Sequence, residues 1–307
     1  MAGISTQGRS AVLETSGLTK FYGKSRGVID LNLDLAEGEI FGFIGPNGAG
    51  KTTTIRCLLN FIFPTKGTAR IFGKDVVRDS KEIKANVGYL PGEVAYYGDV
   101  RVRDLLSYSS AFYGRDCLGR AKELADVLEL DLDRRIETLS LGNRKKIGVI
   151  QALMHEPKLL ILDEPTSGLD PLMQKRFYDL LLEENRKGVT VFFSSHVLSE
   201  VQKLCHRVAI LKEGRLLRIE KIEELRGRQL LRVTATFADA RAGAALVASL
   251  HGVVDPRQDG DTLRFTFSGN IDSLIKALSQ VHVTALHLEE PTLEEIFMHY
   301  YEKEGER

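Results

Sequence analysis

The fold of this chain is decided by the stretch Gly45-Pro46-Asn47-Gly48-Ala49-Gly50-Lys51-Thr52-Thr53. The apolar run 40–44 before it is typical of a buried strand, and apolar residues recur at helical spacing after it, up to Ile62. The stretch fits the phosphate-loop pattern G-x-x-x-x-G-K-[ST], which requires a strand before it and a helix after it. The sequence therefore predicts that the chain binds a nucleoside triphosphate.

The residue types in this loop suit a bound phosphate chain. Glycines let backbone N–H groups wrap the phosphates where a side chain would collide, and the following helix points the positive end of its dipole at the anion. Lys51 is expected to reach the β- and γ-phosphates, and the hydroxyl of Thr52 is expected to bind the Mg²⁺ that bridges them. The predicted ligands are therefore ATP and Mg²⁺.

The composition is that of a globular protein with about two domains: 307 residues, of which 43% are hydrophobic and 27% charged. The 42 basic residues balance the 42 acidic ones, so no overall basic field favours nucleic acid, and none is expected as a partner. The three cysteines form no C-x-x-C pair, which favours reduced thiols over zinc or disulfides. Residues 1–10 are expected to be disordered, and no run approaches the roughly 20 apolar residues that span a bilayer.

A second nucleotide motif follows more than a hundred residues later. Residues 158–162 read as a buried strand that ends in Asp163 and Glu164, which is a Walker B pattern. Asp163 is expected to hold Mg²⁺, and Glu164 is expected to polarise the water that attacks the γ-phosphate. An acidic pair after a strand is a weak signal alone, but it is specific when a phosphate loop accompanies it.

Three further motifs are arranged around the Walker B strand: Leu139-Ser140-Leu141-Gly142-Asn143 before it, Ser167-Gly168-Leu169-Asp170 after it, and Ser194-Ser195-His196 at the end of the next strand. In this order and spacing they resemble the nucleotide-binding subunit of ATP-binding-cassette (ABC) transporters. The resemblance covers about residues 11–220. It implies a P-loop (RecA-like) α/β cassette with a helical lobe.

The resemblance also implies roles for individual residues. Tyr22 would stack on adenine, and His196 would contact the γ-phosphate and act in catalysis with Glu164 and Lys51. Ser140 and Gly142 would cap the γ-phosphate that a second copy of the chain holds, and Asp170 would communicate across that homodimer. The implied nucleotide-binding residues are Tyr22, Gly45, Pro46, Asn47, Gly48, Ala49, Gly50, Lys51, Thr52, Thr53, Ser140, Gly142 and Asp170.

Two positions depart from the family pattern. The signature is usually Leu-Ser-Gly-Gly-Gln, whereas Leu141 and Asn143 stand here for the first glycine and the glutamine. Ser140 and Gly142 keep a hydroxyl and a close backbone approach, so function is expected to be retained. The family also places a glutamine after Pro91, where this chain has Gly92. The sequence leaves open whether Glu93, one residue later, supplies an oxygen to the metal.

The expected domains are an ABC ATPase domain at 11–227, with a helical lobe at about 92–157, and a small domain at 228–307. Strands alternating with helices predict a mainly parallel sheet in the first domain. The second reads as an α+β domain of the ferredoxin-like kind. Its ending, Glu290-Pro291-Thr292-Leu293-Glu294-Glu295-Ile296-Phe297, resembles cassette subunits that serve ABC-2-type exporters.

The function predicted from the resemblance is that of an ATP-hydrolysing subunit on the cytoplasmic face of the cell membrane. It would act as a peripheral homodimer beneath a separate integral membrane permease and power export of a drug-like, lipid or peptide substrate. Two alternatives remain open at this point. One is a soluble ABC-type ATPase that acts on ribosomes or nucleic acid, and the other is a slow ATP-sensing regulatory module.

Overall fold

The computed structural model describes residues 11–227 and 230–289. Contacts divide the chain into two compact units, Met1–Glu220 and Lys221–Arg307. The division follows strand β10 (Arg215–Lys221), a few residues before the boundary expected at 227. The expectations for residues 1–10 and for the ending at 290–297 concern segments outside the described residues.

A six-stranded sheet forms the centre of the first unit. Its strand order is β10, β9 (Arg207–Lys212), β3 (Ile40–Ile44), β8 (Thr190–Ser195), β7 (Leu159–Asp163) and β6 (Val87–Leu90). Strands β9, β3, β8, β7 and β6 pair in parallel, and every residue of β3, β7 and β8 is buried. The predicted parallel α/β core is confirmed. Because parallel strands end at one edge, the segments after β3, β7 and β8 are brought together there.

A second, antiparallel sheet was not expected. It has the order β2 (Ser25–Ala36), β1 (Ala11–Tyr22), β4 (Lys66–Ile71) and β5 (Lys74–Asp75). One face of it is apolar, with Leu13, Leu31 and Ile71 fully buried in a core shared with helix α1 (Lys51–Leu58). Antiparallel strands with one buried face are typical of such a sheet. The alternation of strands and helices in the sequence does not predict it, because β1 and β4 are separated in the chain by β2, β3 and α1.

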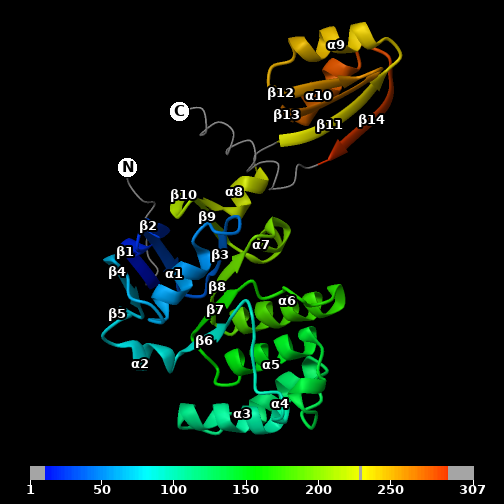
Figure 1. Cartoon of the computed structure of the whole chain (residues 1–307). Coiled ribbons are helices and arrows are strands. Elements are labelled where there is room, and N and C mark those ends of the chain that lie inside the picture. The colour runs from blue at the N-terminus through cyan, green and yellow to red at the C-terminus, as the bar shows by residue number, and fades with distance from the viewer. Residues whose placement is uncertain (1–10, 228–229, 290–307) are drawn as a thin grey trace. The chain divides into compact units, whose positions relative to one another are not determined.

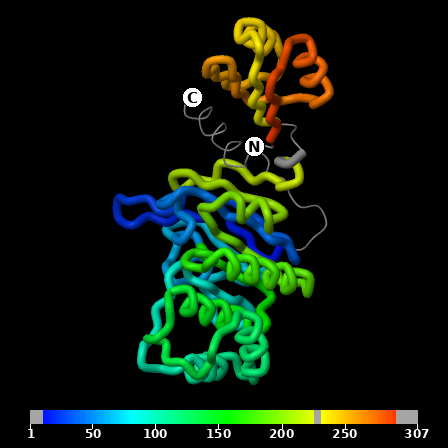
Figure 2. Tube along the Cα trace, turned by 90° about the vertical axis from the view of Figure 1, so that its right-hand side faces the viewer, coloured from blue at the N-terminus to red at the C-terminus, as the bar shows by residue number. Residues whose placement is uncertain are grey.

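The helices expected between the two nucleotide motifs are present, with ends shifted by a few residues. They are α3 (Val102–Ser110), α4 (Leu118–Val127) and α5 (Leu141–Leu153), with the short turns η1 (Ala111–Tyr113) and η2 (Ile136–Thr138). They lie together at the end of the first unit away from β1 and β2 (Figures 1 and 2). Helix α5 begins at Leu141 because the side chain of Ser140 caps it, accepting a hydrogen bond from Asn143 N.

The remaining helices of the first unit flank its strands. They are α2 (Ser80–Lys84), α6 (Pro171–Arg186) and α7 (Leu198–Leu204). The sequence predicts a helix over residues 171–186, and α6 has these bounds. Pro171 occupies its first turn, where a missing N–H costs nothing. Helix α7 follows β8 directly and packs on it.

The second unit begins with α8 (Ile222–Gly227) and continues with a β-α-β-β-α-β run. Its elements are β11 (Leu230–Phe237), α9 (Ala240–Ser249), β12 (Val253–Asp259), β13 (Thr262–Ser268), α10 (Ile271–Leu278) and β14 (Val283–Glu289). The strands form an antiparallel sheet in the order β12, β13, β11, β14. Strand β12 was not predicted, because it is mostly exposed and contains Pro256. No helix in the described residues is long and apolar enough to cross a membrane.

Candidate functional site

The phosphate loop has the backbone that its glycines predict. Gly48 and Gly50 have φ values of +77° and +106°, in the left-handed region that favours glycine. A Cβ atom at Gly50 would stand 2.6 Å from the carbonyl oxygen of Gly27, so no larger residue fits there without a shift. Helix α1 then begins at Lys51 with no acidic residue in its first turn. This N-terminus therefore presents free N–H groups and a favourable dipole to an anion.

A cavity of about 270 Å³ opens on this loop. It is lined by Arg26, Gly27, Pro46, Asn47, Gly48, Ala49, Gly50, Lys51, Thr52, Thr53 and Glu164. Eight predicted nucleotide-binding residues thus share one cavity with the predicted catalytic carboxylate. Arg26 carried no motif signal and was missed from the sequence. Its guanidinium adds a positive charge to a site that otherwise relies on Lys51.

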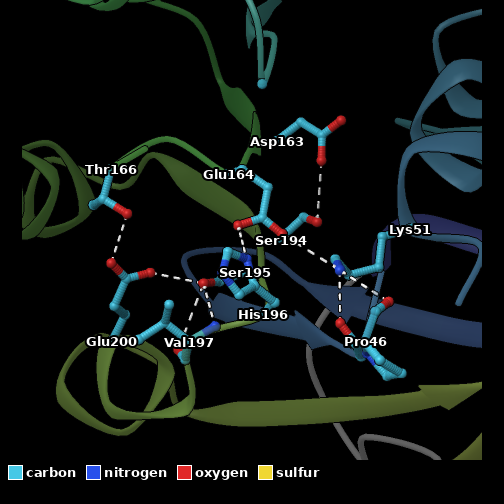
Figure 3. Close-up of polar contacts among 12 residues, drawn as sticks. Pro46, Lys51, Asp163, Glu164, Thr166, Ser194, Ser195, His196, Val197 and Glu200 are labelled. Atoms are coloured by element: carbon cyan, nitrogen blue, oxygen red, sulfur yellow. Dashed lines mark hydrogen bonds and ion pairs between the residues drawn. The ribbon is translucent and has the colours of Figure 1, made fainter. Parts of the chain in front are cut away.

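Lys51 connects the carbonyl groups of the phosphate loop to Glu164 (Figure 3). Its side chain is 6% exposed, and its Nζ donates to the carbonyl oxygens of Gly45 at 2.6 Å and Pro46 at 3.4 Å. The same Nζ lies 3.3 Å from Oε1 of Glu164. The structure therefore joins the phosphate-loop cation directly to the Walker B carboxylate.

Asp163 lies at the buried end of β7 and is 3% exposed. Its Oδ2 accepts a hydrogen bond from Thr52 Oγ1 at 2.8 Å, and its Oδ1 accepts one from Ser194 Oγ at 3.3 Å. Burial raises the pKa of Asp163, and the two hydrogen bonds and the Lys51 charge oppose that rise. A hydroxyl and a carboxylate held this close form the hard oxygen pair that Mg²⁺ prefers.

Glu164 has an unusual backbone and a specific partner. Its φ is +47°, which is uncommon for a residue with a side chain, and its N–H donates to Ser194 O at 3.0 Å. The carboxylate extends between Lys51 and His196, whose Nδ1 lies 2.7 Å from Oε2 of Glu164 (Figure 3). A carboxylate oriented by two cationic or N–H donors is an arrangement suited to a general base.

The signature residues lie apart from this cavity. Ser140 caps α5, and a Cβ atom at Gly142 would stand 3.0 Å from the carbonyl oxygen of Gly168. Leu141 is 65% exposed. Asp170 caps α6, accepting hydrogen bonds from the N–H groups of the second and third helical residues. The structure thus brings the signature turn beside segment 167–170, while none of these residues lines the described cavity.

Tyr22 and Glu93 do not line the described cavity. The Tyr22 ring is partly exposed and lies beside Gly27, because a Cβ atom at Gly27 would meet Tyr22 Cε2 at 3.1 Å and Thr53 Cγ2 at 2.7 Å. Glu93 is exposed, whereas a Cβ atom at Gly92 would stand 4.0 Å from Asp163 Cγ. Position 92 therefore faces the Walker B carboxylates, and metal binding by Glu93 stays a prediction.

Sequence reasoning missed two buried charged residues next to the motifs. Glu200 on α7 is 7% exposed and accepts hydrogen bonds from Thr166 at 2.5 Å and Ser195 at 2.7 Å (Figure 3). It also accepts one from Tyr178 at 3.0 Å. It thereby connects the segment after Walker B to the residue before His196. The second residue is Lys145, on the signature helix. Single charged residues in amphipathic helices carry no sequence signal that separates them from solvated ones.

Comparison with known proteins agrees with this geometry. The family model described as ABC transporter matches residues 28–167. The bacitracin transport ATP-binding protein BcrA of Bacillus licheniformis is 33% identical over 94% of this chain and 97% of its own length. The linearmycin resistance ATP-binding protein LnrL of Bacillus subtilis (strain 168) is 31% identical over 94% of this chain and 97% of its own length.

Among solved structures, an ATP-binding subunit of an ABC transporter superimposes with a TM-score of 0.66 at 27% identity. The match covers 70% of this chain and 92% of that one. The two curated relatives, by contrast, extend over both compact units of this chain.

Proposed function

The chain belongs to the ABC transporter family as one of its ATP-binding ATPase subunits, and from that premise we propose that it powers export through a separate membrane permease. The observation that carries the proposal is the contact of Glu164 with both Lys51 and His196, at the mouth of the phosphate loop. A site that only bound nucleotide would not need an oriented carboxylate beside the phosphate-binding lysine. The same contact disfavours a module that senses ATP without turning it over.

The residues divide the chemistry between them. Lys51 and the loop N–H groups bind and neutralise the phosphates, Glu164 accepts the proton of the attacking water, and His196 orients both. Thr52 and Asp163 would hold Mg²⁺, which supplies charge neutralisation on the β- and γ-phosphates. Their oxygen atoms, 2.8 Å apart, support this assignment.

A second copy of the chain completes the site in this proposal. Ser140 and Gly142 stand at the N-terminus of α5, a helix of 13 residues, and lie outside the cavity of their own subunit. The exposed Leu141 between them supports a contact with another protein surface. In a head-to-tail homodimer, each signature turn would face the phosphate loop of the partner, with Asp170 near the same interface.

Export of a drug-like, lipid or peptide substrate is supported by the names of the relatives, bacitracin transport and linearmycin resistance. Their alignment over both units supports a shared role for the second unit. We assign that unit a ferredoxin-like topology, which its β-α-β-β-α-β order and its sheet order β12, β13, β11, β14 support. The subunit would lie peripherally at the cytoplasmic face of the membrane, bound to its permease.

The test combines an assay with a pull-down. The wild-type chain should hydrolyse ATP, and Glu164→Gln should bind ATP with turnover reduced by roughly a hundredfold or more, since the proton acceptor is lost. That variant, loaded with ATP, should then capture an integral membrane protein from solubilised membranes. Capture of ribosomes or nucleic acid without a membrane protein would replace the export proposal with the soluble alternative.

A further inference from the structure

A buried lysine of the signature helix bonds to the catalytic segment. Lys145, on α5, is 2% exposed. Its Nζ donates to three backbone carbonyl oxygens: Pro91 at 2.9 Å, Gly92 at 2.7 Å and Glu164 at 3.2 Å. These contacts satisfy all three donors of an ammonium group. One side chain therefore connects α5, the loop after β6 and the end of β7.

The contact with Glu164 falls on a strained residue. The left-handed φ of +47° at Glu164 has a free-energy cost and persists only where neighbours hold both sides of the residue. On one side its N–H is fixed by Ser194 O at 3.0 Å. On the other, its carbonyl accepts from Lys145 at 3.2 Å and from Ser167 N at 3.2 Å. Lys145 therefore helps to keep the backbone that aims the Glu164 carboxylate at Lys51 and His196.

The protonation state of Lys145 also suits the three carbonyl oxygens around it. Burial lowers its pKa to about 8, and the nearby carboxylates of Asp163 and Glu164 oppose that fall. At neutral pH the group is therefore mostly an ammonium that can donate to three acceptors. A lysine that served only in packing would not need three hydrogen-bond acceptors around its ammonium group.

Lys145 also reaches the position where this chain departs from its family. Gly92 has no side chain to contact the Walker B residues, although a Cβ atom there would stand 3.5 Å from Asp163 O. The ammonium instead bonds to the Gly92 carbonyl and to the Glu164 carbonyl at once. The connection between this loop and the catalytic carboxylate thus comes from the signature helix.

We propose that Lys145 is a positioning residue for ATP hydrolysis, which ties the signature helix and the Pro91–Gly92 segment to the backbone of Glu164. A shift of α5 is then transmitted to the Glu164 carboxylate through one side chain. The inference rests on the proposed role of Glu164 as proton acceptor.

The test separates positioning from stability by measuring kcat, KM for ATP and ATP affinity in the full-length chain. Lys145→Met keeps the length of the side chain and removes its donors. We expect kcat to fall by roughly tenfold or more, with ATP affinity changed by less than about twofold, because the phosphate loop is untouched. Lys145→Gln, whose amide keeps two donors at shorter reach, should recover part of the rate. Glu164→Gln in the same assay reports separately on the proposed function, which fails if that variant turns over like wild type.

A matched control comes from the same helix. Gln151 also connects α5 to neighbouring segments, through Tyr96 OH at 3.1 Å and Ser109 Oγ at 2.8 Å, and neither of these contacts involves Glu164. Gln151→Met should leave kcat near the wild-type value. Wild-type kcat in Lys145→Met, or equal losses in both methionine variants, would overturn the proposal. Should Lys145→Met not fold, Lys145→Gln decides: reduced kcat at unchanged ATP affinity supports the proposal, and unchanged kcat overturns it.

Discussion

The phosphate-binding edge and the signature end of α5 belong to the same compact unit but differ in how their polar groups are satisfied. At the edge, side chains from two separate segments bond to one another: Lys51 to Glu164, and Thr52 to Asp163. At the signature, Ser140 bonds only within its own helix start, and Leu141 is 65% exposed. The first region is complete within one chain. The second is a helix N-terminus, which favours anions, and it lies outside the cavity that the first region lines.

The difference shows where one chain can act alone. A network closed within the subunit binds ATP without help, whereas a helix N-terminus facing outward contributes only when a second surface meets it. ATP binding and ATP turnover should therefore depend on different regions.

Lys51→Ala should abolish the function of the first region. Removing the buried ammonium takes away the charge that neutralises the phosphates and leaves Glu164 without its cation, so ATP affinity should fall by roughly a hundredfold or more. Equilibrium binding of a fluorescent ATP analogue measures this. Lys187→Ala is the control, since that lysine is exposed, pairs with Glu183 and the buried Glu184, and does not line the cavity. An affinity close to wild type for Lys51→Ala would show that ATP binding does not depend on this region.

Gly142→Asp should affect only the second region. The new side chain meets the Gly168 carbonyl, at 3.0 Å from its Cβ, and puts a negative charge where a partner's phosphate should approach. ATP binding should stay near wild type while turnover falls by roughly a hundredfold. Gly119→Asp is the control, because a Cβ atom at Gly119 meets no neighbour within 4 Å. Parallel losses of binding and turnover would place the signature in the primary binding site.

Thr52→Val tests the proposed Mg²⁺ site within the phosphate-binding region. The substitution removes the hydroxyl that bonds to Asp163 at 2.8 Å and keeps the shape of the side chain. Turnover should fall by about tenfold, and the Mg²⁺ concentration for half-maximal turnover should rise, because one oxygen ligand is lost. Thr52→Ser keeps the hydroxyl and should retain the wild-type Mg²⁺ dependence. An unchanged Mg²⁺ requirement in Thr52→Val would remove Thr52 from the metal site.

The smallest expected effect concerns how the helical segment is joined to the sheet. His155, just after α5, is buried, stacks on Tyr113 and lies 3.2 Å from Val87 O on β6. Burial lowers the pKa of His155 from 6.5 to about 4. The unfolded chain therefore takes up a proton as the pH falls through 6.5 and the folded chain does not, so stability is lost between pH 6.5 and 4, by up to about 3 kcal/mol.

Denaturant unfolding at several pH values tests this difference. His155→Gln can still donate to Val87 O but does not titrate, so its stability should fall less steeply with acid than that of the wild type. The exposed His251→Gln should keep the wild-type slope. Identical slopes in all three proteins would mean that His155 does not link the helical segment to the sheet through its neutral form.

The two regions were also unequally predictable from sequence. The phosphate loop, Walker B and α6 were predicted correctly because each is a pattern of residues that are neighbours in the sequence. The antiparallel sheet and β12 were missed, since their pairing depends on distant partners or on a strand with little apolar character. Lys145 and Glu200 gave no signal, because only the folded chain shows that their charges are buried and bonded.

The central claim is that one chain supplies half of a working site and a second copy supplies the rest. The most direct measurement is the sedimentation of Glu164→Gln with saturating ATP and Mg²⁺, beside the double variant Glu164→Gln, Gly142→Asp. If two chains share the site, Glu164→Gln should form an ATP-dependent dimer. The double variant should remain a monomer that still binds ATP. A Glu164→Gln chain that binds ATP and remains monomeric would contradict this claim.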